Sequence, residues 1–205
     1  VRYIPIIFFI FLFSFTVISC AKKSDSSSSS SADGLPGTYQ LATNDYANGV
    51  ATDSSGNVYV TGGTKGGLDG NTSAGNTDLF VVKYNSSGTK QWTKQLGSSG
   101  LDSANGITID SSGNVYVTGV TFGGLDWNTS AGANDLFVVK YNSSGTKEWT
   151  EQLGSASSDS ANGVATDSSG NVYVAGVTYG GLDGNSNKDN ADLFVVKYNS
   201  SGTKQ

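Results

Sequence analysis

Three loops rich in side-chain oxygens hold the residues of this 205-residue chain that are best suited to chemistry. They read GGLDGNTSAGNTD (66–78), GGLDWNTSAGAND (123–135) and GGLDGNSNKDNAD (180–192). A hard cation such as Ca²⁺ takes about six to eight oxygen ligands, so each loop is a candidate calcium site. The alternative is that these residues shape turns through local hydrogen bonds, because their spacing matches no EF-hand. The candidate ligands are Asp69, Asn71, Asp78, Asp126, Asn128, Asp135, Asp183, Asn185 and Asp192.

The same loops differ from one another in their aromatic residues. Trp127 stands where the other two loops have Gly70 and Gly184, and Phe122 and Tyr179 occupy a position that is lysine in the first loop. A tryptophan where its counterparts are glycine is not part of a shared core, and we expect it to be exposed. Exposed aromatic residues on loops are common anchors for protein or glycan partners. We therefore predict ligand binding at these three aromatic residues, with packing over their own loops as the alternative.

Enzymatic activity is not expected. The chain has no histidine, which is the commonest general base, and its one cysteine is Cys20. Most of the acidic residues recur at the same positions in each repeat, whereas an active site brings different groups to one point. Glu148 and Glu151 are not repeated, but their spacing on a predicted strand places them on opposite faces. No cofactor other than the candidate calcium is implied, and a net charge of −5 argues against nucleic acid as a partner.

The amino-terminal residues indicate export and lipid anchoring. Residues 3–18 form an apolar run that is short for a membrane-spanning helix and typical of a signal peptide. The run ends in Val17-Ile-Ser-Cys20, which resembles the lipobox of bacterial lipoproteins. The resemblance implies a signal peptide over 1–19, a diacylglycerol-carrying Cys20 and attachment to a membrane, at the outer membrane or cell surface of a bacterial envelope. Residues 20–34 then read as a serine-rich tether, and an uncleaved membrane anchor is the alternative.

The rest of the chain, 35–205, repeats with a period of 57 residues and no drift. The repeats cover 47–103, 104–160 and 161–205. Apolar runs bounded by Asp-Ser-Ser-Gly and Asn-Ser-Ser-Gly turns predict four short strands per repeat. In the first repeat these strands are 48–53, 57–62, 78–84 and 92–96. Asp53 and Asn85 are expected to accept backbone N–H bonds in the turns, with glycine in the left-handed conformation.

A repeat of this kind predicts an all-β fold with about three four-stranded antiparallel blades of a β-propeller. A β-solenoid is the alternative. The third repeat is shorter than the others, and residues 35–46 are predicted to be a displaced fourth strand. Thr38, Gln40 and Leu41 in that segment match Thr93, Gln95 and Leu96 in the first repeat. Three blades are fewer than a typical ring, so we expect a partial or oligomer-completed ring that can self-associate through open blade edges.

The repeated segments closely resemble the SBBP family of seven-bladed β-propeller repeats. They read ANGVATDSSGNVYVTG, GGLDGN and DLFVVKYNSSGTKQWTKQLG in the first repeat. The resemblance covers 47–205 and implies a propeller in an exported bacterial protein, with no shared catalytic motif. Together with the residues above, it predicts a lipid-anchored, non-enzymatic binding or display module at the cell envelope. A carbohydrate-active or other ligand-processing propeller, or a purely structural repeat protein, is the alternative.

Overall fold

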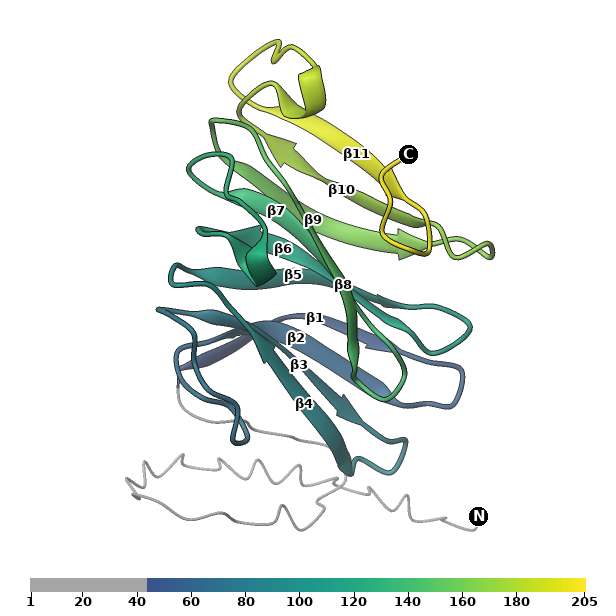
Figure 1. Ribbon diagram of the computed structural model, residues 1–205. Helices are drawn as coiled ribbons and strands as arrows, with labels where there is room; N and C mark the ends of the chain where they lie inside the picture. The colour runs from purple at the N-terminus through teal and green to yellow at the C-terminus, as the bar shows by residue number, and fades with distance from the viewer. Residues whose placement is uncertain (1–43) are drawn as a thin grey trace, which may run out of the picture. The chain divides into compact units, whose positions relative to one another are not determined.

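The computed structural model describes residues 44–205 (Figure 1). The predicted signal peptide, Cys20, the tether and residues 35–43 of the predicted displaced strand lie outside this range. The end of that strand prediction is wrong, because Asp45 and Tyr46 begin the first strand of the first sheet and pair with Thr64 and Gly63. Among the residues that are described, no helix is long and apolar enough to cross a membrane.

The described chain forms three antiparallel sheets that follow one another along the sequence (Figure 1). Each sheet is a meander, in which every strand pairs with the next strand in sequence, and we call the sheets blades 1, 2 and 3. Blade 1 contains β1 (Asp45–Thr52), β2 (Val58–Thr64), β3 (Asp78–Tyr84) and β4 (Lys90–Leu96). Blade 2 contains β5 (Asp102–Ile109), β6 (Val115–Thr121), β7 (Asp135–Tyr141) and β8 (Lys147–Leu153). Blade 3 contains β9 (Asp159–Thr166), β10 (Val172–Thr178) and β11 (Asp192–Tyr198).

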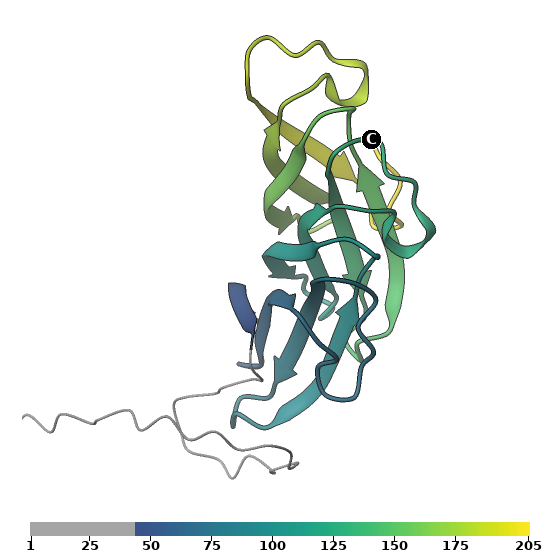
Figure 2. The same cartoon turned by 90° about the vertical axis from the view of Figure 1, so that its left-hand side faces the viewer.

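The blades lie face to face because their central strands are apolar on both sides (Figure 2). One core packs Tyr59, Leu79 and Val81 of blade 1 against Ala104 and other residues of blade 2. A second core repeats this arrangement between blades 2 and 3. The all-β, propeller-like prediction is therefore confirmed, with blades that do not close into a ring within residues 44–205.

The first strand of each blade contacts the first strand of the next blade. Asn48 in β1 donates its side-chain N–H to the backbone carbonyl of Ala104 at 2.9 Å, and Asn105 in β5 donates to Ala161 at the same distance. A β-bulge in each of these strands, beside the asparagine, shifts the register by one residue. These strands begin three residues earlier than predicted, each at an aspartate, and hydrogen bonds can satisfy such a residue inside the sheet. Asp102, for example, accepts hydrogen bonds from the backbone N–H of Ser98 and from the hydroxyl of Thr121.

Aspartate side chains fix the hairpin turns as predicted. In blade 2, one oxygen of Asp110 accepts the backbone N–H groups of Ser112 and Asn114, both at 2.9 Å, and the other accepts the Tyr116 hydroxyl. Gly113 completes the turn with a positive φ of 80°. Asn142 accepts two backbone N–H groups in the same way in the next turn of the blade. Burial would raise the pKa of Asp110, but the hydrogen bonds from Asn114, Ser112 and Tyr116 together hold it below its ordinary value.

This lowered pKa predicts a pH-dependent contribution to stability. A carboxyl whose pKa is lower in the folded state stabilises the fold above its unfolded pKa of about 3.9, and this contribution is lost as the pH falls through the folded pKa. We expect Asp110→Asn, which copies the Asn142 turn, to flatten the loss of stability between about pH 5 and pH 2. Denaturant unfolding of the full chain at a series of pH values measures this.

Other titrating groups also change the stability with pH, but their contributions are the same in the wild type and in Asp110→Asn and cancel in the comparison. Burial and the charge of Asp78 raise the pKa of Asp102, against hydrogen bonds that lower it, so Asp102 contributes with the opposite sign in both proteins. An Asp110→Asn curve with the wild-type pH dependence would contradict the prediction.

Candidate binding loops

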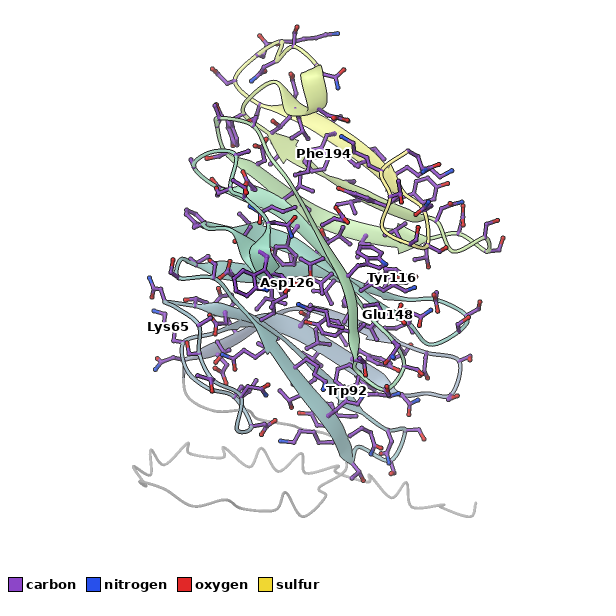
Figure 3. All side chains as sticks on the ribbon, viewed as in Figure 1. Lys65, Trp92, Tyr116, Asp126, Glu148 and Phe194 are labelled. Carbon is purple, nitrogen blue, oxygen red and sulfur yellow. The ribbon has the colours of Figure 1, made fainter. Side chains whose placement is uncertain are left out.

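The long loops lie at one end of the blades and the short turns at the other (Figure 1). Lys65, at the start of the first long loop, lies at the loop end, whereas Trp92 lies toward the turn end (Figure 3). Neighbouring blades are joined at the loop end by backbone hydrogen bonds. Asp102 of blade 2 donates its N–H to the carbonyl of Thr77 in the blade 1 loop at 2.7 Å, and Asp159 of blade 3 donates to that of Asn134 in the blade 2 loop at 2.9 Å. The loops therefore form one continuous surface, which we call the loop face.

A glutamine on the fourth strand holds each of the first two long loops. In blade 2, the side-chain oxygen of Gln152 accepts the N–H of Leu125 at 2.9 Å. Its amide nitrogen donates to the carbonyl of Gly123 at 3.0 Å and to the carboxylate of Asp135 at 2.6 Å. Leu125 is fully buried, so the loop is anchored by one apolar and several polar contacts. These glutamines were not recognised in the sequence, although their recurrence at the same place in two repeats is a usable signal.

The tip of the blade 2 loop is a single 3-10 turn, η1 (Leu125–Trp127), and blade 3 has a matching turn, η2 (Leu182–Gly184). The sequence predicted no helical turn in either place. Asn128 ends η1 by donating its side-chain N–H to the carbonyls of Leu125 at 3.0 Å and Thr150 at 3.2 Å. Asp126 is ion-paired with Lys147 of β8. These contacts fix the backbone on both sides of Trp127.

Trp127 is completely exposed, with a relative accessibility of 100%. Its backbone is left-handed, with a φ of 69°, and the equivalent Gly70 and Gly184 have φ values of 80° and 77°. The left-handed region costs an ordinary residue about 1–2 kcal/mol, which glycine avoids. The structure thus confirms that Trp127 is exposed, and it adds that the residue occupies a backbone position suited to glycine. Backbone strain is unfavourable for folding and commonly marks a functional position.

The other two aromatic residues of the predicted ligand site, Phe122 and Tyr179, are half-exposed, at 52% and 51%. Each follows the second strand of its blade, on the loop face. The equivalent residue in blade 1 is Lys65, which is also exposed. The loop face thus carries aromatic groups on blades 2 and 3 and a cationic group on blade 1.

The candidate calcium ligands have protein partners of their own. In blade 1, Asp69 is ion-paired with Lys90 at 2.5 Å and accepts a hydrogen bond from Thr93. Asp78 is fully buried and accepts the N–H of Ala74 at 2.8 Å and the amide of Gln95 at 2.7 Å. Across residues 44–205, no three His, Cys, Asp or Glu side chains gather as a metal site.

The other candidate ligands behave in the same way. Asn71 and Asn185 donate to the carbonyls of Leu68 and Leu182, as Asn128 does to that of Leu125. Asp135 and Asp192 accept backbone N–H groups within their loops, and Asp183 is ion-paired with Lys204. This geometry favours the turn-shaping alternative, and calcium binding stays a prediction for experiment.

Each loop carboxylate already has at least one protein donor, although one oxygen each of Asp78 and Asp135 is buried without a hydrogen-bond partner. We expect excess chelator to leave the melting temperature of the full chain unchanged. A metal that bound only the folded state would instead raise the melting temperature, and chelator would reverse the rise. Thermal unfolding with and without added Ca²⁺, followed by chelator, measures this. A fall of several degrees in chelator would establish a structural calcium site.

Four-stranded antiparallel meanders packed face to face, with their first strands adjacent, define a β-propeller repeat protein. Residues 40–69, 91–126 and 148–183 match the β-propeller repeat family SBBP, and the chain belongs to that family.

Two curated relatives are similar over most of the chain. One is regulatory protein FlaEY of Caulobacter vibrioides, 27% identical over an alignment of 171 positions that covers 75% of this chain and 18% of the relative. The other is the uncharacterized WD repeat-containing protein L264 of Acanthamoeba polyphaga mimivirus, 28% identical over an alignment of 152 positions that covers 65% of this chain and 11% of the relative. The chain therefore spans less than a fifth of either relative.

Proposed function

We propose that the chain is a non-enzymatic binding module whose loop face, centred on Trp127, holds a protein or glycan partner. The observation that carries the proposal is the complete exposure of Trp127 in a left-handed backbone where the other loops have glycine. Aromatic side chains supply large contact area on binding at low conformational cost. Phe122 and Tyr179 extend the apolar surface on the same face.

The loop is rigid enough to present such an anchor. Gln152, Asn128 and the ion pair between Asp126 and Lys147 hold the residues on both sides of Trp127. Binding to a side chain on a held backbone costs less conformational entropy than binding to a side chain on a mobile loop, which must be ordered first. This arrangement favours recognition over catalysis, since the groups around Trp127 are engaged in holding the loop.

We further propose that the module is exported and anchored by a lipid on Cys20. The support is the apolar run over 3–18 followed by Val-Ile-Ser-Cys. Of the two relatives, one is named a regulatory protein and the other a WD repeat-containing protein. A display role at the envelope agrees with a repeat domain joined to a polar tether.

The test is binding of the full chain, in detergent, to a panel of glycans and envelope proteins, with turnover of each ligand followed in parallel. We expect at least one ligand to be bound without being changed, and Trp127→Gly to lose that ligand. Chemical conversion of any ligand would contradict the non-enzymatic proposal. Absence of binding across the panel would favour a purely structural role.

A further inference from the structure

Blade 2 carries two exposed aromatic side chains at its long loop. Phe122 precedes the loop and is 52% exposed, and Trp127 at the loop tip is 100% exposed. Blade 2 has a neighbouring blade packed on each of its faces, so both side chains stay exposed in a blade whose own packing is complete. The matching residues of blade 1 are Lys65 and Gly70, although the two loops agree at ten of their thirteen positions. The pair of aromatic groups therefore distinguishes the blade 2 loop.

The loop that carries Trp127 presents no free charge. Residues 123–135 include two charged residues, Asp126 and Asp135. Lys147 of β8 neutralises Asp126 through an ion pair. Asp135 is fully buried and accepts hydrogen bonds from within its own blade. A strongly charged partner, such as an acidic peptide, therefore finds no complementary charge on this loop.

The apolar area on the loop is too small for a typical protein partner. Protein interfaces of standard size bury about 800 Å² on each side, and more than half of that area is apolar. Trp127 and Phe122, one fully and one half exposed, together supply on the order of 300 Å². The remaining exposed surface of the loop is uncharged and mostly backbone, because Gly124 and residues 131–133 are exposed and have small side chains.

A pyranose sugar matches this surface in size and polarity. The C–H groups of a pyranose ring form a small apolar face that can stack on one aromatic side chain, and its hydroxyl groups project from the edges toward peptide groups. Binding sites for small ligands combine aromatic surface with a few polar groups in this way. A sugar without charge also fits a loop that presents no free charge.

The backbone holds both aromatic residues in place. Phe122 donates its N–H to the carbonyl of Leu101 at 2.9 Å. Gly124 lies so close to Asn128 that a Cβ atom would be 2.2 Å from the backbone oxygen of Asn128, so only glycine lets the loop close below Trp127. The two aromatic positions are five residues apart in sequence and thus at most about 18 Å apart in space. An oligosaccharide of several sugar units spans such a distance.

Building on the binding role proposed above, we propose that the blade 2 loop binds an uncharged oligosaccharide by stacking one pyranose ring on Trp127 and another on Phe122. Each stacked ring removes apolar surface from water and requires no ion pair. Blades 1 and 3 have glycine in place of Trp127, so the described part of the chain carries one such site.

Titration of the full chain, in a detergent without a sugar headgroup, tests the proposal. The probes are uncharged hexasaccharides and disaccharides of glucose, mannose, galactose and N-acetylglucosamine. We expect saturable binding of at least one hexasaccharide, with a chemical-shift change at the indole N–H of Trp127 and none at those of the partly buried Trp92 and Trp149. The hexasaccharide should bind about 3- to 10-fold more tightly than its disaccharide, because the longer ligand also contacts Phe122. Its affinity should change little with added salt.

Two variants install the residues that blade 1 has at the same positions. Trp127→Gly should lower the affinity for the hexasaccharide by at least about 30-fold. Phe122→Lys should lower it by about 3- to 10-fold and remove the difference between hexasaccharide and disaccharide. Thr72→Ala is the control, because Thr72 is exposed on the blade 1 loop and should leave the affinity unchanged.

Failure of this proposal can be distinguished from failure of the proposed function. Binding of an envelope protein through Trp127, with none of the hexasaccharides bound, would overturn the assignment to a sugar and leave the binding role in place. Absence of both kinds of binding would overturn both. Equal affinity for hexasaccharide and disaccharide, or an affinity that falls steeply with salt, would contradict an uncharged site with two aromatic platforms.

Discussion

Replacement of Leu136 by alanine is expected to lower the free energy of unfolding by about 2–5 kcal/mol. Leu136 is fully buried in the core between blades 2 and 3, where it packs with Val138, Ala161 and Val174. Truncation removes apolar contacts and leaves a cavity between two sheets that cannot fully collapse. Denaturant unfolding of the full chain measures the change.

The repeat supplies a matched control for this prediction. Leu193 is the equivalent residue of blade 3 and is 84% exposed, so Leu193→Ala should change the free energy of unfolding by about 0.5 kcal/mol or less. Both measurements belong at a concentration too low for association between copies. Similar losses for the two variants would show that the exposed face of blade 3 is covered in solution.

Replacement of Trp127 by glycine is expected to weaken ligand binding strongly and to stabilise the fold. Glycine removes the cost of a left-handed tryptophan, so the free energy of unfolding should rise by about 1 kcal/mol. Loss of a central aromatic anchor commonly costs 2 kcal/mol or more of binding, which is a decrease in affinity of about 30-fold. Titration of a ligand from the panel and denaturant unfolding measure the two effects.

A variant that is more stable but binds ligand more weakly would show that Trp127 serves ligand binding and does not stabilise the fold. Thr129→Ala is the control, because Thr129 is exposed on the same loop and should alter neither quantity by much. A less stable Trp127→Gly variant would mean that the indole packs on its own loop, and retained affinity would remove Trp127 from the site.

Much of the fold could be predicted because the local signals agree with one another. The segment 78–84 was predicted as a strand with the bounds that β3 has, since its residues are apolar on both faces and the Asn85 turn follows it. The turn chemistry was also predicted, because aspartate or asparagine followed by Ser-Ser-Gly has few alternatives. The exposure of Trp127 followed from comparison with Gly70 and Gly184.

The features that the sequence did not predict depend on contacts between residues that are distant in sequence. The loop contacts of Gln95 and Gln152 cross about 30 residues of sequence, and a glutamine on a strand carries no local sign of what it holds. The early start of β5 at Asp102 was missed because an aspartate is unfavourable in a strand unless other residues satisfy it, as Ser98 and Thr121 do. The left-handed backbone at Trp127 was hidden for the same reason, since only the surrounding contacts maintain it.

The hydrogen bond from Asn48 to Ala104, repeated from Asn105 to Ala161, has a consequence for how such a protein changes over evolutionary time. The side-chain amide of one blade donates to a backbone carbonyl of the next blade, and the equivalent residue of blade 3, Asn162, is exposed to solvent. Duplication or deletion of a whole 57-residue unit therefore leaves every remaining junction chemically intact. Stability then rises in steps, with one junction added per unit, as in other linear repeat arrays. The number of blades is thus a property of the gene and of assembly, and no single blade encodes it.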